Sequence, residues 1–197
     1  FQSAWAAQRS PHTPWVSRVI HNPVDLVAFS PVGPLAPLPP WEGPRVAVVA
    51  WSLNIKKGGL RAHRLALGYP EVQFVFCGRF DAQIQAAPNI VHAGMLDTRA
   101  LAATLRACDV LLTFAEDEAC PNHVLEALAC GLPVLYKDSG ATNELVSVAG
   151  QPVTRDTFYG SLLHWRARGQ EARDLARKQA ERFAPEVIFP MYMQAMR

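Results

Sequence analysis

Two glutamates and a proline mark the segment of the sequence that is richest in potential chemistry. Glu118 and Glu126 are separated by seven residues, and Pro121 lies between them. Pro121 suits the first position of a helix, where its missing N–H is not needed. The free amides of Asn122 and His123 would then point out of the helix start, where amides and the helix dipole favour a phosphate group. The segment therefore predicts a phosphate site at a helix N-terminus.

Glu126 is an acid in an otherwise apolar helix. It would lie about 7–8 Å along the helix axis, on the face of Asn122, four residues earlier. Val124, Leu125 and Leu128 occupy the other faces and would be buried. A carboxylate cannot be buried alone cheaply, but it can accept two hydrogen bonds from a vicinal diol such as a ribose. An ordinary exposed or capped glutamate is the alternative that this segment leaves open.

Two lysines and a glycine, Lys56-Lys57-Gly58, lie in the loop after the predicted strand 45–51. A lysine at this point could pair with a phosphate, although a solvated turn is the ordinary alternative. The sequence has no G-x-G-x-x-G after this strand and no G-x-x-x-x-G-K-[ST], which disfavours a nicotinamide-binding domain and a P-loop nucleotidase. Cys120, His123 and Cys130 match no zinc spacing, so no metal site is predicted.

Alternating strands and helices would position these groups. This alternation predicts βαβ units and an α/β fold, a Rossmann-like doubly wound and mostly parallel sheet. Ligands bind such sheets beyond the carboxyl ends of the strands, where Lys57 and Glu118 both fall. The predicted strands are 18–20, 45–51, 72–77, 89–92, 109–114 and 133–136, and the predicted helices are 58–67, 98–107, 121–129 and 143–146, with helical structure from 157 broken near 169 and 185.

Prolines divide the chain into three parts. Residues 1–17 read as an irregular remnant of an N-terminal domain or linker. Residues 18–184 form the predicted Rossmann-like domain, with a proline-rich linker at 23–44, and residues 185–197 form a C-terminal helix. The chain begins with phenylalanine, so we expect it to be a fragment of a longer protein.

Composition narrows the choice of partner and compartment. The net charge is only +2, whereas a nucleic-acid partner calls for a concentrated basic patch. Acids interrupt the basic region 166–182, which predicts a solvated helix face. The four cysteines form no C-x-x-C pair and predict buried thiols in a reducing, cytoplasmic location. No apolar run approaches the ~18 residues of a membrane span.

Taken together, these stretches resemble the group-one family of retaining GT-B glycosyltransferases. Residues 19–25, V-I-H-N-P-V-D, are similar to the family's V-I-x-N-G-V-D segment. The pair of glutamates, with E-A-L-A-C-G-L-P-V from residue 126, is similar to its E-x7-E signature followed by E-A-x-A-C-G-x-P-V. Residues 107–110 match its A-x-D-V motif, and residues 138–140 and 144–146 match the two ends of its D-x-G-G-x-x-E-[LIV]-[LIV] tail.

The resemblance implies the C-terminal half of a GT-B fold, the half that holds a nucleotide sugar. Lys57 would neutralise the departing diphosphate, together with the amides of Asn122 and His123. Glu118 would lie near the donor sugar and orient it. Ser52 replaces the arginine that the family usually has five residues before the lysine, which weakens the charge compensation.

The remaining donor contacts are also implied by the resemblance. Glu126 would bind the ribose, and Gly94 and Met95 would lie near the base. No cofactor or metal ion is expected, and a UDP-sugar is favoured over a GDP-sugar. A hexosyl or related group would pass to a saccharide or lipid-linked acceptor, held by an N-terminal domain that this chain lacks.

Two other functions stay open at this point. One is a non-catalytic module that binds nucleotide sugars or another protein, and the other is a GT-B nucleotide-sugar epimerase. No nucleic-acid partner is expected. Contact with a membrane surface, which would make the full-length protein a peripheral membrane protein, is left open through the N-terminal domain.

Overall fold

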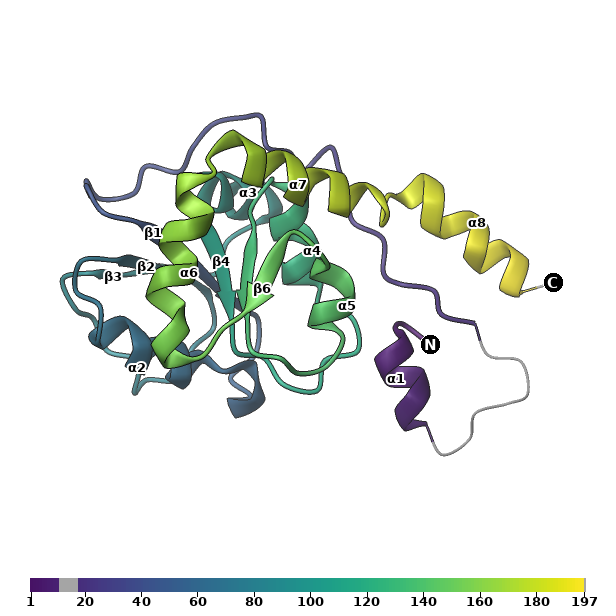
Figure 1. Ribbon diagram of the computed structural model, residues 1–197, viewed down its shortest axis with the longest axis horizontal. Coiled ribbons are helices and arrows are strands. Elements are labelled where there is room, and N and C mark those ends of the chain that lie inside the picture. The colour runs from purple at the N-terminus through teal and green to yellow at the C-terminus, as the bar shows by residue number, and fades with distance from the viewer. Residues whose placement is uncertain (11–17, 197) are drawn as a thin grey trace.

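The fold is built on one six-stranded parallel sheet (Figure 1). The computed structural model describes residues 1–10 and 18–196. The strand order is β3-β2-β1-β4-β5-β6, and each of the five pairings is parallel. The prediction of a doubly wound, mostly parallel sheet is confirmed. The strands are β1 Arg45–Ala50, β2 Gln73–Gly78, β3 Ile90–Gly94, β4 Val110–Thr113, β5 Val134–Tyr136 and β6 Gly150–Pro152.

Helices cover both faces of the sheet. Helices α2 and α6 pack on one face, and α3, α4, α5 and most of α7 pack on the other. The helix α8 projects away from the body of the molecule (Figure 1). The bounds are α1 Ala4–Arg9, the 3-10 helix η1 Ile55–Lys57, α2 Gly59–Leu67, α3 Thr98–Arg106, α4 Asn122–Ala129, α5 Thr142–Val146, α6 Arg155–Ala167, α7 Gln170–Glu181 and α8 Pro185–Ala195.

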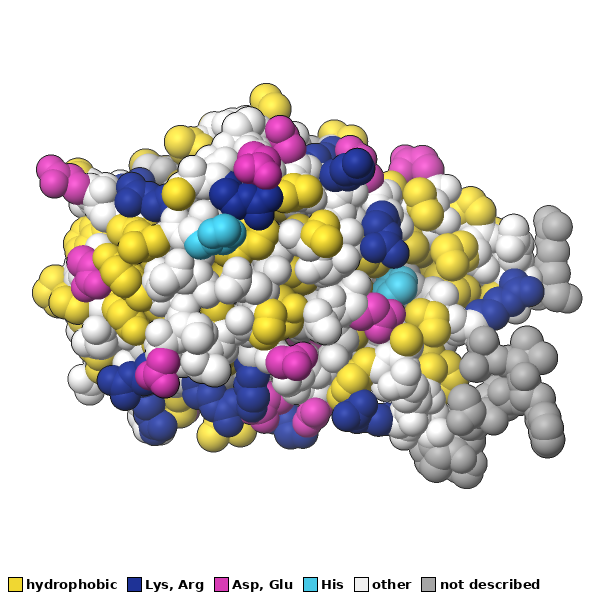
Figure 2. Space-filling model, in the orientation of Figure 1, with side chains coloured by type: hydrophobic (Ala, Val, Ile, Leu, Met, Phe, Trp, Pro, Cys, Tyr) yellow, Lys and Arg dark blue, Asp and Glu magenta, His cyan; other side chains and the backbone are white. Residues whose placement is uncertain are grey.

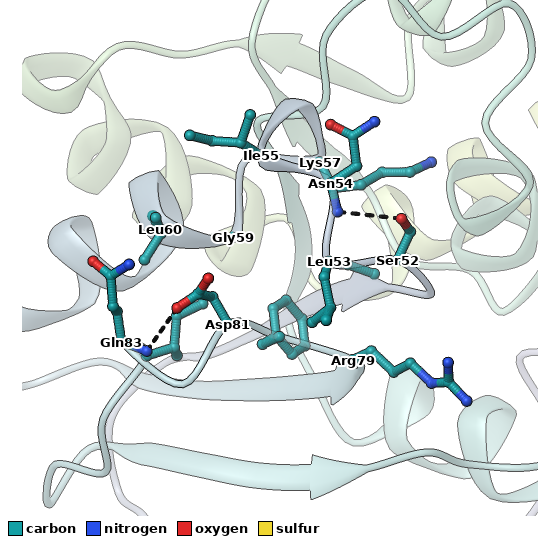
Figure 3. Close-up of a pocket in the computed structure, with 13 residues that line it drawn as sticks. Ser52, Leu53, Asn54, Ile55, Lys57, Gly59, Leu60, Arg79, Asp81 and Gln83 are labelled. Carbon is teal, nitrogen blue, oxygen red and sulfur yellow. Dashed lines mark hydrogen bonds between the residues drawn. The ribbon is translucent and has the colours of Figure 1, made fainter.

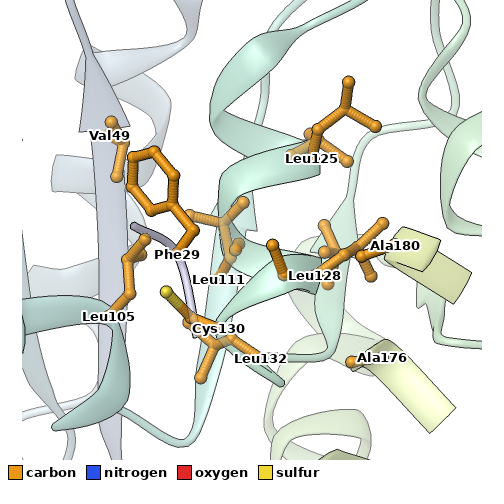
Figure 4. Close-up of a cluster of buried hydrophobic side chains, with 14 of the residues drawn as sticks. Phe29, Val49, Leu105, Leu111, Leu125, Leu128, Cys130, Leu132, Ala176 and Ala180 are labelled. Atoms are coloured by element: carbon orange, nitrogen blue, oxygen red, sulfur yellow. The ribbon is translucent and has the colours of Figure 1, made fainter. Parts of the chain in front are cut away.

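The two hydrophobic clusters explain why the central strands are apolar along their whole length. β1, β2 and β4 have helices on both sides, so successive side chains are buried alternately in one cluster and the other. Leu111 of β4 packs with Leu105, Leu125 and Leu128 on the face of α3 and α4 (Figure 4). On the opposite face, Leu112 joins the cluster formed with α2 and α6.

The proline-rich segment 23–44 contains no helix or strand, yet it packs against the body. Phe29 is buried in the cluster of α3 and α4 (Figure 4). Arg177 of α7 donates to the carbonyl oxygen of Phe29 at 3.0 Å, and Arg106 donates to that of Pro34 at 3.0 Å. The prediction that 166–182 forms a solvated basic face is therefore wrong for Arg177, and also for Arg173, which donates to the carbonyl of Cys108.

The structure corrects two local predictions and adds one strand. Residues 18–20 form no strand, because their partner is the single residue Phe1, whose carbonyl accepts from the amide of Ile20 at 2.8 Å. Residues 1–17 are not irregular throughout, since α1 is helical. Residues 11–17 and 197 of the predicted terminal segments lie outside the described part of the chain. The strand β6 was not predicted.

Candidate functional site

The candidate site lies where the sheet changes its direction of growth, between β1 and β4. In a doubly wound sheet this point leaves a crevice beyond the carboxyl ends of the two strands. Lys57 follows β1 and Glu118 follows β4, 61 residues later in the chain, and Lys57 Nζ donates a hydrogen bond to Glu118 Oε1. The fold thus joins the two side chains for which the resemblance implied catalytic roles.

Further ion pairs join the same two loops. Lys56 Nζ lies 2.9 Å from Asp117 Oδ2, and Arg61 pairs with Glu116. Hydrogen bonds from Lys137 and Arg61 lower the pKa of Glu116 to about 2. Figure 2 shows acidic and basic side chains gathered along the lower rim, over the carboxyl ends of the strands. Each of the three acidic side chains at these loops is thus paired with at least one lysine or arginine.

Two glycines allow the loops to approach so closely. Gly58 has a φ of +75°, and a Cβ on it would lie 2.5 Å from Phe114 Cβ and from its carbonyl oxygen. Gly140 has a φ of +64°, and its Cβ would lie 2.7 Å from the backbone nitrogen of Glu118. Both positions need a left-handed backbone and no side chain. These contacts fix Lys57 and Glu118 on opposite sides of one gap.

The start of α4 presents backbone amides beside Glu118. Pro121 lies at the N-cap, with ψ of 110°, so the prediction that it is the first helical residue is wrong by one position. Neither N–H of Asn122 and His123 has an acceptor within residues 1–10 and 18–196. These amides and the helix dipole create a positive potential without a side-chain charge. An anion such as phosphate is the natural ligand for such a helix start.

The side chain of His123 is buried directly behind Glu118, a placement that was not predicted. Its Nε2 lies 3.1 Å from Thr113 Oγ1, and its Nδ1 lies 4.0 Å from Glu118 Oε2. Burial, with a smaller contribution from the charge of Lys57, lowers the pKa of His123 to about 3. The imidazole is therefore neutral at physiological pH.

A cavity of about 400 Å³ opens onto this group. Four of the predicted site residues line it, namely Lys57, Glu118, Asn122 and His123. Gln2 and Trp51 also line this cavity. Sequence reasoning missed both, since neither lies in a recognisable motif. The other lining residues are Asp117, Ala119, Cys120 and Pro121.

Asn22 ties the N-terminal segment to this cavity. Its Nδ2 donates to Asn122 Oδ1 at 2.7 Å, and its Oδ1 accepts from Gln2 Nε2 at 2.8 Å. Nearby, the carboxylate of Glu144 accepts from the amide of Ala4 at the start of α1. Side chains of the segments 19–25 and 138–146, both matched to the family's motifs, therefore hold residues 1–9 beside the cavity.

The other three predicted donor contacts lie outside this cavity. Glu126 is on α4, where its Oε2 is buried and has no hydrogen-bond partner in the described part of the chain. Burial raises the pKa of Glu126 to about 7. Gly94 and Met95 lie at the carboxyl end of the edge strand β3, and the side chain of Met95 is exposed.

A second, smaller cavity of about 120 Å³ adjoins Lys57 on the side of β2. Ser52, Lys57 and Arg79 all line it. In Figure 3 the side chains of Lys57 and Arg79 extend to the same side, with Ser52 between them in the view. The backbone amide of Arg79 donates to the carbonyl of Ala50 at 2.8 Å, which holds it beside the end of β1. Arg79 was missed because it belongs to no recognised motif.

The described residues offer neither a metal-binding cluster nor a membrane-spanning helix. Residues 1–10 and 18–196 contain no group of three or more histidine, cysteine, aspartate or glutamate side chains placed to hold a metal ion. Within the same residues, no helix has both the length and the apolar character that crossing a bilayer requires.

Comparison with known proteins agrees with this geometry. Residues 37–159 match the family model of the glycosyl transferases group 1. The chain is 29% identical over 149 residues to WcaC of Escherichia coli (strain K12), whose name assigns it to glycosyl transfer in colanic acid biosynthesis. This match covers 73% of the chain and 36% of WcaC.

Solved structures share the fold at low sequence identity. Sucrose-phosphate synthase from Thermosynechococcus elongatus superposes with a TM-score of 0.84 at 19% identity, over 99% of this chain and 56% of that one. HepE from Anabaena superposes with a TM-score of 0.72 at 19% identity, over 91% of this chain and 56% of that one. The chain therefore spans about half the length of these proteins or less. The predicted C-terminal, Rossmann-like half of a GT-B fold is confirmed.

Proposed function

Because the chain belongs to the group 1 glycosyl transferases, we propose that it forms the donor-binding half of a retaining GT-B enzyme. A nucleoside-diphosphate sugar would bind at the crevice between β1 and β4 and give up a hexosyl or related group. The observation that carries this proposal is the meeting of Lys57 and Glu118 beside the start of α4, in a cavity of about 400 Å³. Lys57, a cation for phosphate, and Glu118, an acceptor for sugar hydroxyls, thereby line the same cavity.

On binding, the diphosphate would replace Glu118 as the partner of Lys57. In the structure Lys57 is paired with Glu118, so neither group is free for a ligand. An incoming diphosphate would take the carboxylate's place on Lys57 and accept from the amides of Asn122 and His123. Glu118 would then turn to the donor sugar. Stabilising the negative charge that develops on the departing diphosphate is electrostatic catalysis and needs no metal ion.

The nucleoside would extend over α4 and β3. Glu126 would bind the ribose, since its buried Oε2 lacks a partner among the described residues. Gly94 and Met95 would lie near the base. UDP is the first nucleotide to test. HepE was solved with UDP and glucose and with UDP-glucose, and TarM of S. aureus was solved with UDP.

A saccharide or lipid-linked acceptor would be held by a second, N-terminal domain. We place the whole enzyme in the cytoplasm, with peripheral contact to a membrane surface through that domain. Within this chain, residues 1–17 would lead from that domain, 18–184 would form the donor domain with its linker at 23–44, and 185–197 would form the terminal helix.

The geometry does not favour an epimerase. Such an enzyme needs an acid–base pair in the cleft, and Glu118 with His123 is the nearest arrangement in the described residues. A histidine whose pKa is lowered to about 3 is neutral at neutral pH and so is not the protonated general acid that an epimerase would need. The donor domain of a transferase explains the same residues without that requirement.

Calorimetry with UDP, GDP and ADP tests the proposal on residues 1–197. We expect UDP to bind, and we expect Glu126→Ala to weaken that binding by about tenfold or more, because a charge-assisted hydrogen bond is lost. Glu71→Ala removes an exposed carboxylate elsewhere and serves as the control. An intact fold that binds none of the three nucleotides would contradict the proposal and favour a non-catalytic interaction module.

A further inference from the structure

Two buried polar side chains, Thr113 and His123, lie behind Glu118, the proposed sugar contact. Thr113 ends β4, His123 is in the first turn of α4, and Glu118 lies in the loop between them. The His123 side chain is 7% exposed and that of Glu118 is 15% exposed. Glu118 Oε1 accepts from Lys57, whereas its Oε2 is buried without a hydrogen-bond partner in the described part of the chain. The imidazole of His123 is the polar group that faces this second oxygen.

The hydroxyl of Thr113 is the hydrogen-bond partner of the other ring nitrogen, Nε2. Thr113 Oγ1 accepts from the amide of Ala115 at 3.2 Å, and it lies 3.1 Å from His123 Nε2. No other acceptor for the threonine proton is found among residues 1–10 and 18–196, so the proton is directed to Nε2. A neutral imidazole that accepts at Nε2 carries its own proton at Nδ1. Nδ1, which then carries the proton, is 4.0 Å from Glu118 Oε2.

We infer that His123 is a positioning residue: its Nδ1–H holds the carboxylate of Glu118 in place for the donor sugar. This inference rests on the proposed function. When a diphosphate displaces Glu118 from Lys57, the carboxylate loses its partner at Oε1. His123 then supplies the remaining hydrogen bond at Oε2, and the separation of 4.0 Å shortens as the site closes around its ligand.

A neutral donor suits this role better than a second cation. A protonated imidazole would compete with the sugar for the charge of Glu118, whereas a neutral one fixes the carboxylate and leaves it a charged acceptor. The sugar hydroxyls can then donate to Oε1, the oxygen that Lys57 releases. The side chain of His123 therefore affects recognition of the sugar, whereas its backbone amide serves the diphosphate.

Nitrogen-15 NMR of the imidazole tests the inference without a ligand. We expect His123 to be the Nδ1–H tautomer in the wild-type chain and to lose that preference in Thr113→Val, while Thr113→Ser retains it. An Nε2–H tautomer in the wild-type chain would overturn the inference. Because this measurement uses only the wild-type chain and Thr113 variants, it does not require a His123 variant to fold.

Binding of UDP and UDP-glucose supplies the functional readout. The affinity for UDP-glucose relative to that for UDP should fall about fivefold in His123→Phe. His123→Asn should restore most of it, because its amide N–H takes the place of Nδ1–H. Equal losses for both ligands, or no change in the ratio, would overturn the inference. A wild-type chain that binds neither ligand contradicts the proposed function itself.

Discussion

At the scale of single residues, the carboxyl group of Glu126 has a property that can be measured directly. Burial raises its pKa to about 7. A carboxyl group whose folded-state pKa is raised contributes stability that is fully present below its unfolded pKa of 4.5 and is lost as the pH rises through about 7. In the unliganded chain the protonated form is therefore favoured, whereas a ribose diol prefers the ionised form, which accepts two hydrogen bonds.

Donor binding should therefore strengthen as the pH rises through the pKa of Glu126. Between about pH 6 and about pH 8 the affinity for UDP-glucose, whose diphosphate is esterified at both ends and keeps its charge over this range, should increase up to about tenfold, as expected for ionisation of one group near 7. Calorimetry in two buffers of different ionisation enthalpy should show proton release at the lower pH. Glu126→Gln should abolish both effects, and Glu71→Gln should leave them intact. A flat wild-type profile would contradict the assigned role of Glu126.

Sequence reasoning named several candidate site residues but not how they pair. Glu118, Glu126 and Lys57 were found because they fall in segments that resemble a family. The bond between Lys57 and Glu118 could not be predicted, since it joins loops 61 residues apart. The side chain of His123 was missed for the same reason: its partners, Thr113 and Glu118, become neighbours only when β4 and α4 pack.

At the scale of elements, Gly58 controls how closely the loop after β1 approaches β4. Gly58→Ala should destabilise the fold by about 2 kcal/mol or more, because of the positive φ and the contact with Phe114. Gly160→Ala is the matched control. Gly160 lies within α6 with open space around it, so alanine there should stabilise by up to about 1 kcal/mol. Urea denaturation measures both changes, and equal effects would refute the role given to Gly58.

The elements that sequence predicted are those with strong local patterns. The strands β1, β2 and β4 are buried on both faces and so read as continuous apolar runs. β6 was missed because Gly-Gln-Pro at the sheet edge has no apolar pattern. The short helix α1 was missed because its start is stabilised by Glu144, a tertiary contact 140 residues away.

At the scale of the whole molecule, the candidate site lies at the carboxyl ends of the strands. Residues from the start of the chain also reach it. Gln2, near the start of the chain, lines the cavity and donates to Asn22. Helix α8 projects from the body and exposes Phe189 and Met193. These features are consistent with our proposal that a second domain faces the donor cavity.

The central claim is that a nucleoside diphosphate binds across the carboxyl ends of β1 and β4. Titration of the nitrogen-15-labelled chain with UDP, followed by amide chemical shifts, tests it most directly. The account predicts shifts concentrated in the loops 51–58 and 114–121 and in the first turn of α4. Saturable shifts centred instead on the face of α2 and α6, around Arg64 and Arg155, or no shifts at all, would contradict it.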